Sequence, residues 1–151
     1  MAGPLAGNAL RAAARALWRV GPAALWATAI YWFSDQPHLP QLDLTLLDLL
    51  AKKSAHAAGY AVFAVLLQRA LDPGRHDAGR RRLAWLLAVA YAVSDEWHQA
   101  FVPGRTATPL DVAIDGAGAA VGLRLWPALR DRASPLLRRP RAPQWRPPPP
   151  R

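Results

Sequence analysis

The stretch YAVSDEWHQAFVPGRTATPLDVAIDGAGAAVG, residues 91–122, decides how this chain folds. It begins and ends in apolar, helix-like sequence, and the pair Pro103-Gly104 separates the two halves. The polar side chains between its apolar ends are Asp95, Glu96, His98, Gln99, Arg105, Asp111 and Asp115. Helices of membrane length carry this many ionisable groups only where the groups face one another or a wet cavity. The stretch therefore predicts two helices that share a polar site.

The composition describes a small chain in which apolar blocks alternate with arginine-rich connectors. Of its 151 residues 52% are hydrophobic, yet the mean hydropathy is +0.00 because the connectors offset the blocks. This length allows at most one ordinary domain. The chain has no cysteine, which excludes a disulfide framework and thiolate chemistry. The net charge of +9 could suggest a nucleic-acid partner, but the positions of the charges argue against one.

Four apolar segments are expected to be helices that cross a membrane. The first has no charged residue from Val20 to Ser34, and the fourth has Thr108 as a good N-cap. The predicted spans cover residues 16–34, 54–71, 83–102 and 109–126. Around them we expect a cytoplasmic N-terminal segment (1–15), an interfacial segment (42–50) and a cytoplasmic basic, Pro-rich tail (127–151) that is disordered beyond Leu137. The predicted fold class is an all-α membrane protein with a four-transmembrane-helix bundle.

The distribution of basic residues supports a membrane over the alternative of a soluble core. Any one of these short segments could be a buried helix of a soluble protein. With a cytoplasmic N-terminus and four crossings, however, only Lys52, Lys53 and Arg105 of the 19 basic residues fall on the outer side. This is the asymmetry of the positive-inside rule, and a soluble nucleic-acid binder has no reason to show it. We therefore expect a multi-pass membrane protein with both termini cytoplasmic.

The same topology brings polar groups from four segments to the outer half of the membrane. Asp35 ends the first span, Lys52, Lys53 and His56 begin the second, and acids occupy the end of the third and the start of the fourth. Carboxylates beside histidine can act as general acid and base, so Asp95, Glu96 and His98 are the catalytic candidates. The ligand-binding candidates are Lys53, His56, Gln99, Arg105, Asp111 and Asp115. No metal motif, P-loop or GxGxxG sequence is present, and no metal or cofactor is expected.

Each of these residues also has a plainer interpretation. His56 could be a hydrogen-bonding histidine at the interface, and Lys53 could reach the headgroups. Asp111 could be only a helix-capping acid. Gly118 and Gly122 form a GxxxG pair, which is a helix-packing device. The cluster is therefore more informative than any single member.

Three motifs in order resemble the VanZ-like family of bacterial membrane proteins. They are Phe33-Ser34-Asp35-Gln36-Pro37, the run with Lys53, His56 and Tyr60, and the block Ser94-Asp95-Glu96-x-His98-Gln99-x-Phe101-x-Pro103-Gly104-Arg105 followed by Asp111 and Gly118. The resemblance implies a small polytopic protein of the cytoplasmic membrane. The family is named for a protein linked to resistance to the glycopeptide antibiotic teicoplanin.

The leading functional expectation is a cell-envelope protein that recognises, or also modifies, a lipid-linked or cell-wall-related ligand at the outer leaflet. Its partner would be a membrane lipid or lipid-linked ligand. A second possibility is a non-enzymatic membrane partner whose polar cluster only locks helices together. A third is a proton-coupled or small-solute transporter. An enzyme requires an acid/base pair open to a cavity, whereas a structural partner requires the same groups paired and sealed.

Overall fold

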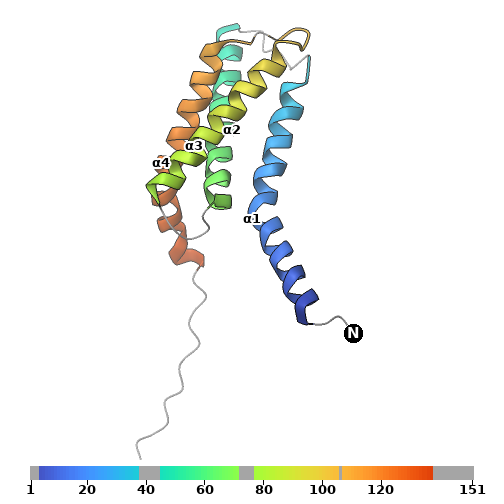
Figure 1. The fold of residues 1–151 in the computed structure, drawn as a ribbon. Helices are drawn as coiled ribbons and strands as arrows, with labels where there is room; N and C mark the ends of the chain where they lie inside the picture. Colours follow the sequence, from blue (N-terminus) through green and yellow to red (C-terminus); the bar gives the residue numbers. More distant parts are fainter. Residues whose placement is uncertain (1–3, 38–44, 72–76, 106, 138–151) are drawn as a thin grey trace, which may run out of the picture.

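The structure, a computed structural model, describes residues 4–37, 45–71, 77–105 and 107–137. This described part contains four helices and no strand, which confirms the predicted all-α, four-helix architecture (Figure 1). The helices are α1 (Pro4–Ser34), α2 (Thr45–Leu71), α3 (Ala78–Gln99) and α4 (Pro109–Leu137). Successive helices run in opposite directions, so the C-terminal ends of α1 and α3 lie beside the N-terminal ends of α2 and α4.

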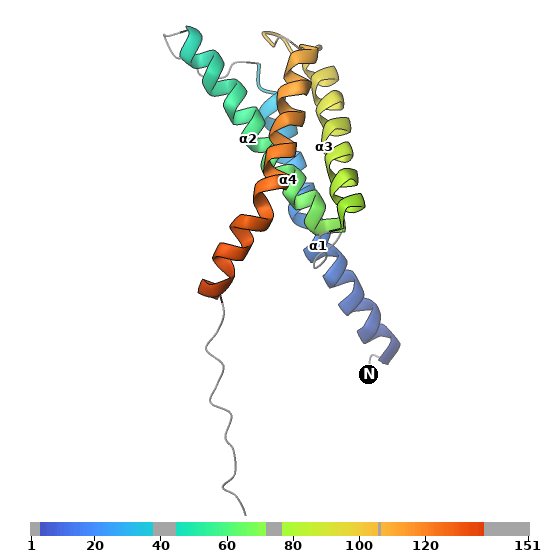
Figure 2. The same cartoon turned by 90° about the vertical axis from the view of Figure 1, so that its left-hand side faces the viewer.

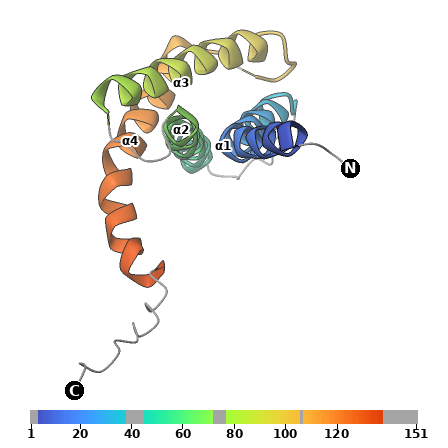
Figure 3. The same cartoon turned by 60° about the horizontal axis from the view of Figure 1, so that its bottom comes forward.

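Helix α2 is the centre of the bundle and contacts the other three helices, with α4 most extensively (Figure 3). The α2–α4 contact is made backbone to backbone. A Cβ atom added at Gly118 would overlap the carbonyl of Ala57, and one added at Gly122 would overlap the carbonyl of Ala61. The GxxxG pair on α4 therefore lies directly on a row of alanines on α2, as its spacing predicts.

The bundle has a small-residue core and a large-residue surface. Ala64, Ala84, Ala88, Ala92 and Ala119 are fully buried, whereas the buried aromatic side chains are Tyr60 and Phe63. The exposed large apolar side chains include Trp18, Leu25, Leu86, Trp97, Phe101 and Leu125. Water-soluble bundles bury such side chains, but helices packed in lipid do not gain from doing so. The distribution is that of helices that pack through small residues and present bulk to lipid.

Along its length, helix α1 is tied to α2 and α3 by hydrogen bonds. The Trp26 indole donates to Gly59 O at 2.9 Å, and the Tyr91 hydroxyl donates to Ala27 O at 2.7 Å. Lower down, the Arg69 guanidinium lies 5.3 Å from the Trp18 ring and also donates to the Trp18 carbonyl. Beyond these points α1 and α4 diverge from the bundle in opposite directions (Figure 2). Helix α1 is the most loosely held of the four.

The observed helix ends differ from the predicted ones. Residues 4–34 form one helix, rather than a separate segment followed by a span. Residues 45–50, expected to be interfacial, are the first turns of α2, and 42–44 lie outside the described residues. Helix α3 begins at Ala78, where Asp77 accepts a hydrogen bond from Gly79 N at 3.1 Å. In each case the predicted boundary was placed at polar residues, and the structure shows that these residues are part of the helix.

The C-terminal boundary was also wrong. Helix α4 was expected to end near Trp126, before Pro127, but it continues to Leu137. Proline inside a helix removes one backbone hydrogen bond and tends to kink the helix rather than always end it. The predicted disorder of the tail concerns residues that, from 138 onward, lie outside the described part.

Among the described residues, length and composition give one candidate membrane span. Residues Pro109–Arg132, with a mean hydropathy of 1.2, form the one described helix segment that is apolar enough to cross a bilayer. The other helices include charged side chains near their ends, which lowers their averages. The predicted four crossings are therefore not confirmed by hydropathy.

Candidate functional site

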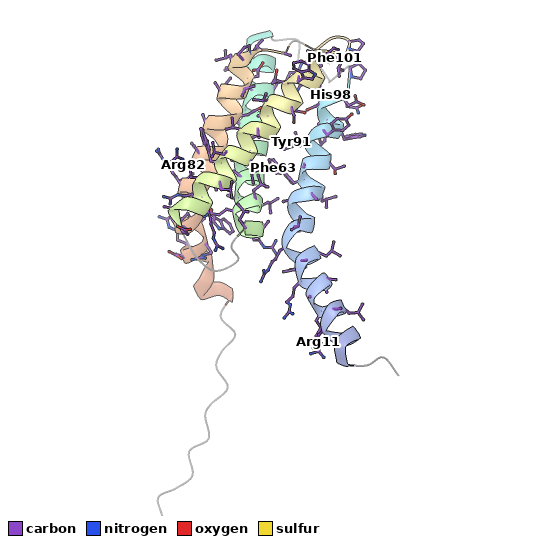
Figure 4. The ribbon with its side chains drawn as sticks, in the orientation of Figure 1. Arg11, Phe63, Arg82, Tyr91, His98 and Phe101 are labelled. Carbon is purple, nitrogen blue, oxygen red and sulfur yellow. The ribbon has the colours of Figure 1, made fainter. Side chains whose placement is uncertain are left out.

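The polar residues of all four helices meet at one end of the bundle, which we call the polar end. It comprises the C-terminal turns of α1 and α3 and the N-terminal half of α2 and of α4. Figure 4 shows His98 there, beside α1, whereas Arg82 lies at the opposite end of α3. The arrangement follows from the alternating helix directions, and it divides the candidate residues among four groups with different partners.

The first group is a sealed cluster around Asp95. One oxygen of Asp95 accepts hydrogen bonds from Ser34 at 2.8 Å, Gln99 at 3.1 Å and Tyr60 at 3.4 Å. Gln99 also donates to Ser34 at 3.3 Å. All four side chains are buried and they come from α1, α2 and α3. The other oxygen of Asp95 has no hydrogen-bond partner among the described residues. This cluster joins three helices through side chains that are almost fully buried, and Ser34 and Tyr60 are its members nearest to the cleft described below.

The second group ties α3 to the start of α4. Glu96 accepts a hydrogen bond from the backbone N–H of Thr108 at 2.9 Å. Thr108 caps α4, with its hydroxyl accepting from Asp111 N at 3.3 Å and donating to the Asp111 carboxylate at 2.8 Å. Lys53 forms an ion pair with the same carboxylate. In a capping box the acid at the third helical position takes the N-cap N–H, but here Glu96 from another helix takes it.

The third group is the pair of His56 on α2 and Asp115 on α4. His56 Nδ1 lies 3.7 Å from Asp115 Oδ2, which is longer than a hydrogen bond. Asp115 is 1% exposed, and neither of its oxygens has a hydrogen-bond partner among the described residues. His56, by contrast, is partly exposed. The pair therefore has one buried member and one member that reaches solvent.

The fourth group lies at the rim. His98 pairs with Asp35 at 3.0 Å and stacks on Tyr31, with ring centroids 4.6 Å apart. Arg105 donates from Nε to Gln36 O at 3.2 Å and also to Phe33 O. These are carbonyls at the C-terminal end of α1, which a guanidinium can cap. Burial lowers the pKa of the Arg105 guanidinium, because it outweighs the opposite effect of the carboxylates of Asp95 and Glu96.

A cleft of about 380 Å³ opens between α1 and α2 at the polar end. Its polar lining consists of Ser34, Lys52, His56, Tyr60 and Arg105, and its apolar wall includes Trp26, Ile30 and Phe33. The structure thus places two of the predicted ligand-binding residues, His56 and Arg105, on one cavity. The catalytic candidates Asp95, Glu96 and His98 do not line it.

The cleft separates the candidates by what they can do chemically. Asp95 and Gln99 are sealed, Glu96 is occupied by a backbone N–H, and His98 is paired at the surface. His56, with Asp115 behind it, is the acid/base pair that opens to a cavity. Among the residues described, no group of three His, Asp or Glu side chains is arranged to hold a metal ion.

Sequence reasoning did not select Ser34, Tyr60 or Thr108 as partners within the site. Tyr60 lies one turn beyond His56 on the same helix face, which was a usable signal. Ser34 ends an uncharged segment next to Asp35, and nothing in its spacing shows that it turns inward to Asp95. The ion-pair partner of His56 is Asp115, and Tyr60, one turn further along α2, donates a hydrogen bond to Asp95.

The chain is an antiparallel helical bundle with an alanine-rich core, exposed large apolar side chains and polar groups gathered at one end. The family model VanZ/LLP1 matches residues 14–130, so the chain belongs to the VanZ-like family of membrane proteins. The matched range contains every residue of the four groups described above. No curated protein and no solved structure shows significant similarity to the chain.

Proposed function

We propose that this protein recognises an anionic lipid-linked or cell-wall-related ligand at the outer leaflet of the bacterial cytoplasmic membrane. The observation that carries the proposal is the α1–α2 cleft, which combines basic and hydrogen-bonding side chains with an apolar wall. Arginine, lysine and histidine suit a phosphate or carboxylate headgroup, and Trp26 and Phe33 suit a hydrocarbon chain. A ligand with both parts uses the whole cleft.

The proposal includes four membrane crossings with both termini in the cytoplasm. Its supports are the basic residues, which concentrate away from the polar end, and the large apolar side chains exposed on all four helices. The polar end then faces outward. The headgroup side of a lipid in the outer leaflet reaches the cleft from there.

Single-cysteine labelling tests this topology cleanly because the chain has no cysteine of its own. Ala78→Cys, at the start of α3, should react with a membrane-impermeant maleimide only after the cells are permeabilised. Pro103→Cys, in the turn after α3, should react in intact cells. If both positions were labelled from the same side, α3 could not cross the membrane.

The ligand proposal predicts that His56→Gln lowers affinity for a polyisoprenyl phosphate about tenfold or more, since a hydrogen bond to a charged group is lost. The measurement is binding by the detergent-purified full chain, with the matching polyisoprenol as the ligand control. His98→Gln is the matched control variant, because His98 lies outside the cleft and pairs with Asp35. Equal affinity for the phosphate and the alcohol, or equal losses in both variants, would reject the cleft as the headgroup site.

The proposal extends to glycopeptide resistance, which the family name suggests and which a separate measurement tests. Susceptibility to teicoplanin should fall in a sensitive strain that expresses the chain and should return with the His56→Gln variant. A change that persists in the variant would separate the phenotype from the cleft.

A second candidate function is that of a non-enzymatic membrane partner, and the sealed Asp95 cluster favours it. Ser34, Tyr60 and Gln99 donate hydrogen bonds to Asp95, and Gln99 also donates to Ser34, so these groups join the helices to one another. The two functions differ in the role of the cleft, since a structural partner has no use for a phosphate ligand. The binding experiment above therefore also decides between them.

A further inference from the structure

A second cavity, of about 260 Å³, lies at the other end of the bundle between α3 and α4. Three guanidinium groups line it, those of Arg81 and Arg82 from α3 and of Arg124 from α4. Trp85 and Leu123 form its apolar wall. Figure 4 shows Arg82 near the lower end of α3, far from His98. The cavity shares no lining residue with the α1–α2 cleft.

The contact between α3 and α4 fixes the positions of these arginines. The Trp85 indole donates a hydrogen bond to Gly116 O at 2.9 Å. A Cβ atom added at Gly116 would lie 3.3 Å from Val89 Cγ2, so the helices approach closely there. Ala84 and Ala88, which lie one turn apart on α3, are also fully buried. The backbones that carry the three arginines therefore have little freedom to separate.

The charges around the cavity are unbalanced within the described part of the chain. Neighbouring arginines have carboxylate partners, since Arg80 lies 3.9 Å from Asp77 and Arg130 lies 3.7 Å from Asp131. No described carboxylate lies within ion-pair distance of Arg81, Arg82 or Arg124. Three like charges around one small cavity repel one another unless an anion lies between them.

We propose that this cavity binds the phosphate headgroup of an anionic phospholipid in the membrane leaflet at the arginine-rich end. Guanidinium groups bind phosphate oxygens in pairs, and two helices supply them from different directions. The partly exposed indole of Trp85 packs against the first part of the acyl chains. Because this indole and the phosphate-binding groups line the same cavity, a lipid fits it better than free phosphate does. In the proposed topology this leaflet is the cytoplasmic one, where anionic lipids attract basic segments.

The test is native mass spectrometry of the full chain in detergent, with phosphatidylglycerol or phosphatidylcholine added. We expect the wild-type chain to prefer phosphatidylglycerol. Replacing two cavity arginines, in Arg82→Gln with Arg124→Gln, should lower that preference about tenfold or more. The matched control is Arg130→Gln with Arg132→Gln, which removes the same charge from α4 outside the cavity and should leave the preference within about twofold.

Three results would overturn the proposal. Equal binding of the two lipids by the wild-type chain would show that there is no headgroup selection. Equal losses in the two double variants would show diffuse attraction to a basic surface. Displacement of the lipid by millimolar inorganic phosphate would assign the cavity to free phosphate. None of these results bears on the α1–α2 cleft, so the two proposals can fail separately.

Discussion

Replacing Asp95 by alanine should lower the free energy of unfolding by about 3 kcal/mol, because three buried donors lose their acceptor together. Ser34, Tyr60 and Gln99 all donate to one oxygen of Asp95, and all three side chains are buried. The apparent melting temperature of the purified protein should fall by about 10 °C.

The matched control is Asp35→Ala, which removes the same group from an exposed pair. Asp35 contacts His98 at the rim, and its side chain is 53% exposed. An exposed pair contributes about 0–1 kcal/mol, so the melting temperature should change by no more than about 3 °C. Should Asp95→Ala prove as stable as Asp35→Ala, the buried cluster would not be what holds α1 and α2 to α3.

Replacing Gly118 by alanine should destabilise the bundle by about 2 kcal/mol, although alanine favours helices and is small. The added methyl group would overlap the carbonyl of Ala57, which is backbone and cannot turn aside. Helices α2 and α4 must then separate, and their contact is the most extensive in the molecule. The apparent melting temperature is expected to fall by about 5 °C.

Gly59→Ala is the matched control, since an added Cβ atom there meets no other atom within 4 Å. That variant should keep or slightly raise the melting temperature, because alanine has the higher helix propensity. If the two glycine variants have the same melting temperature, then α2 and α4 are not in backbone contact as described.

Much of the architecture could be predicted from the sequence because apolar blocks, turn residues and arginines act locally. They indicated four helices, and the family motifs pointed to the same part of the chain as the family match. Helix ends were less predictable, as at Pro127, because a helix continues wherever its neighbours satisfy or tolerate the altered backbone.

The pairing of polar groups could not be predicted. Helical spacing shows which side chains share a face, but it does not show which helix that face meets. His56 pairs with Asp115 because the glycines of α4 bring that helix directly against α2. Glu96 had the features of a catalytic acid, yet its partner is a backbone N–H in the turn that follows its own helix.

The charged levels along α4 also set the thickness of bilayer that this bundle can match. Asp111 at the polar end and Arg124 beside the second cavity are separated by about 20 Å, at a rise of 1.5 Å per residue. The hydrocarbon of an average bilayer is about 30 Å thick. Asp111 is already paired with Lys53, so the charge that limits the match is that of Arg124. In the proposed four-span topology, lipid in contact with α4 would become thinner near Arg124, or the Arg124 side chain would extend along the helix to the headgroups. A bilayer of short-chain lipids would then suit the bundle best.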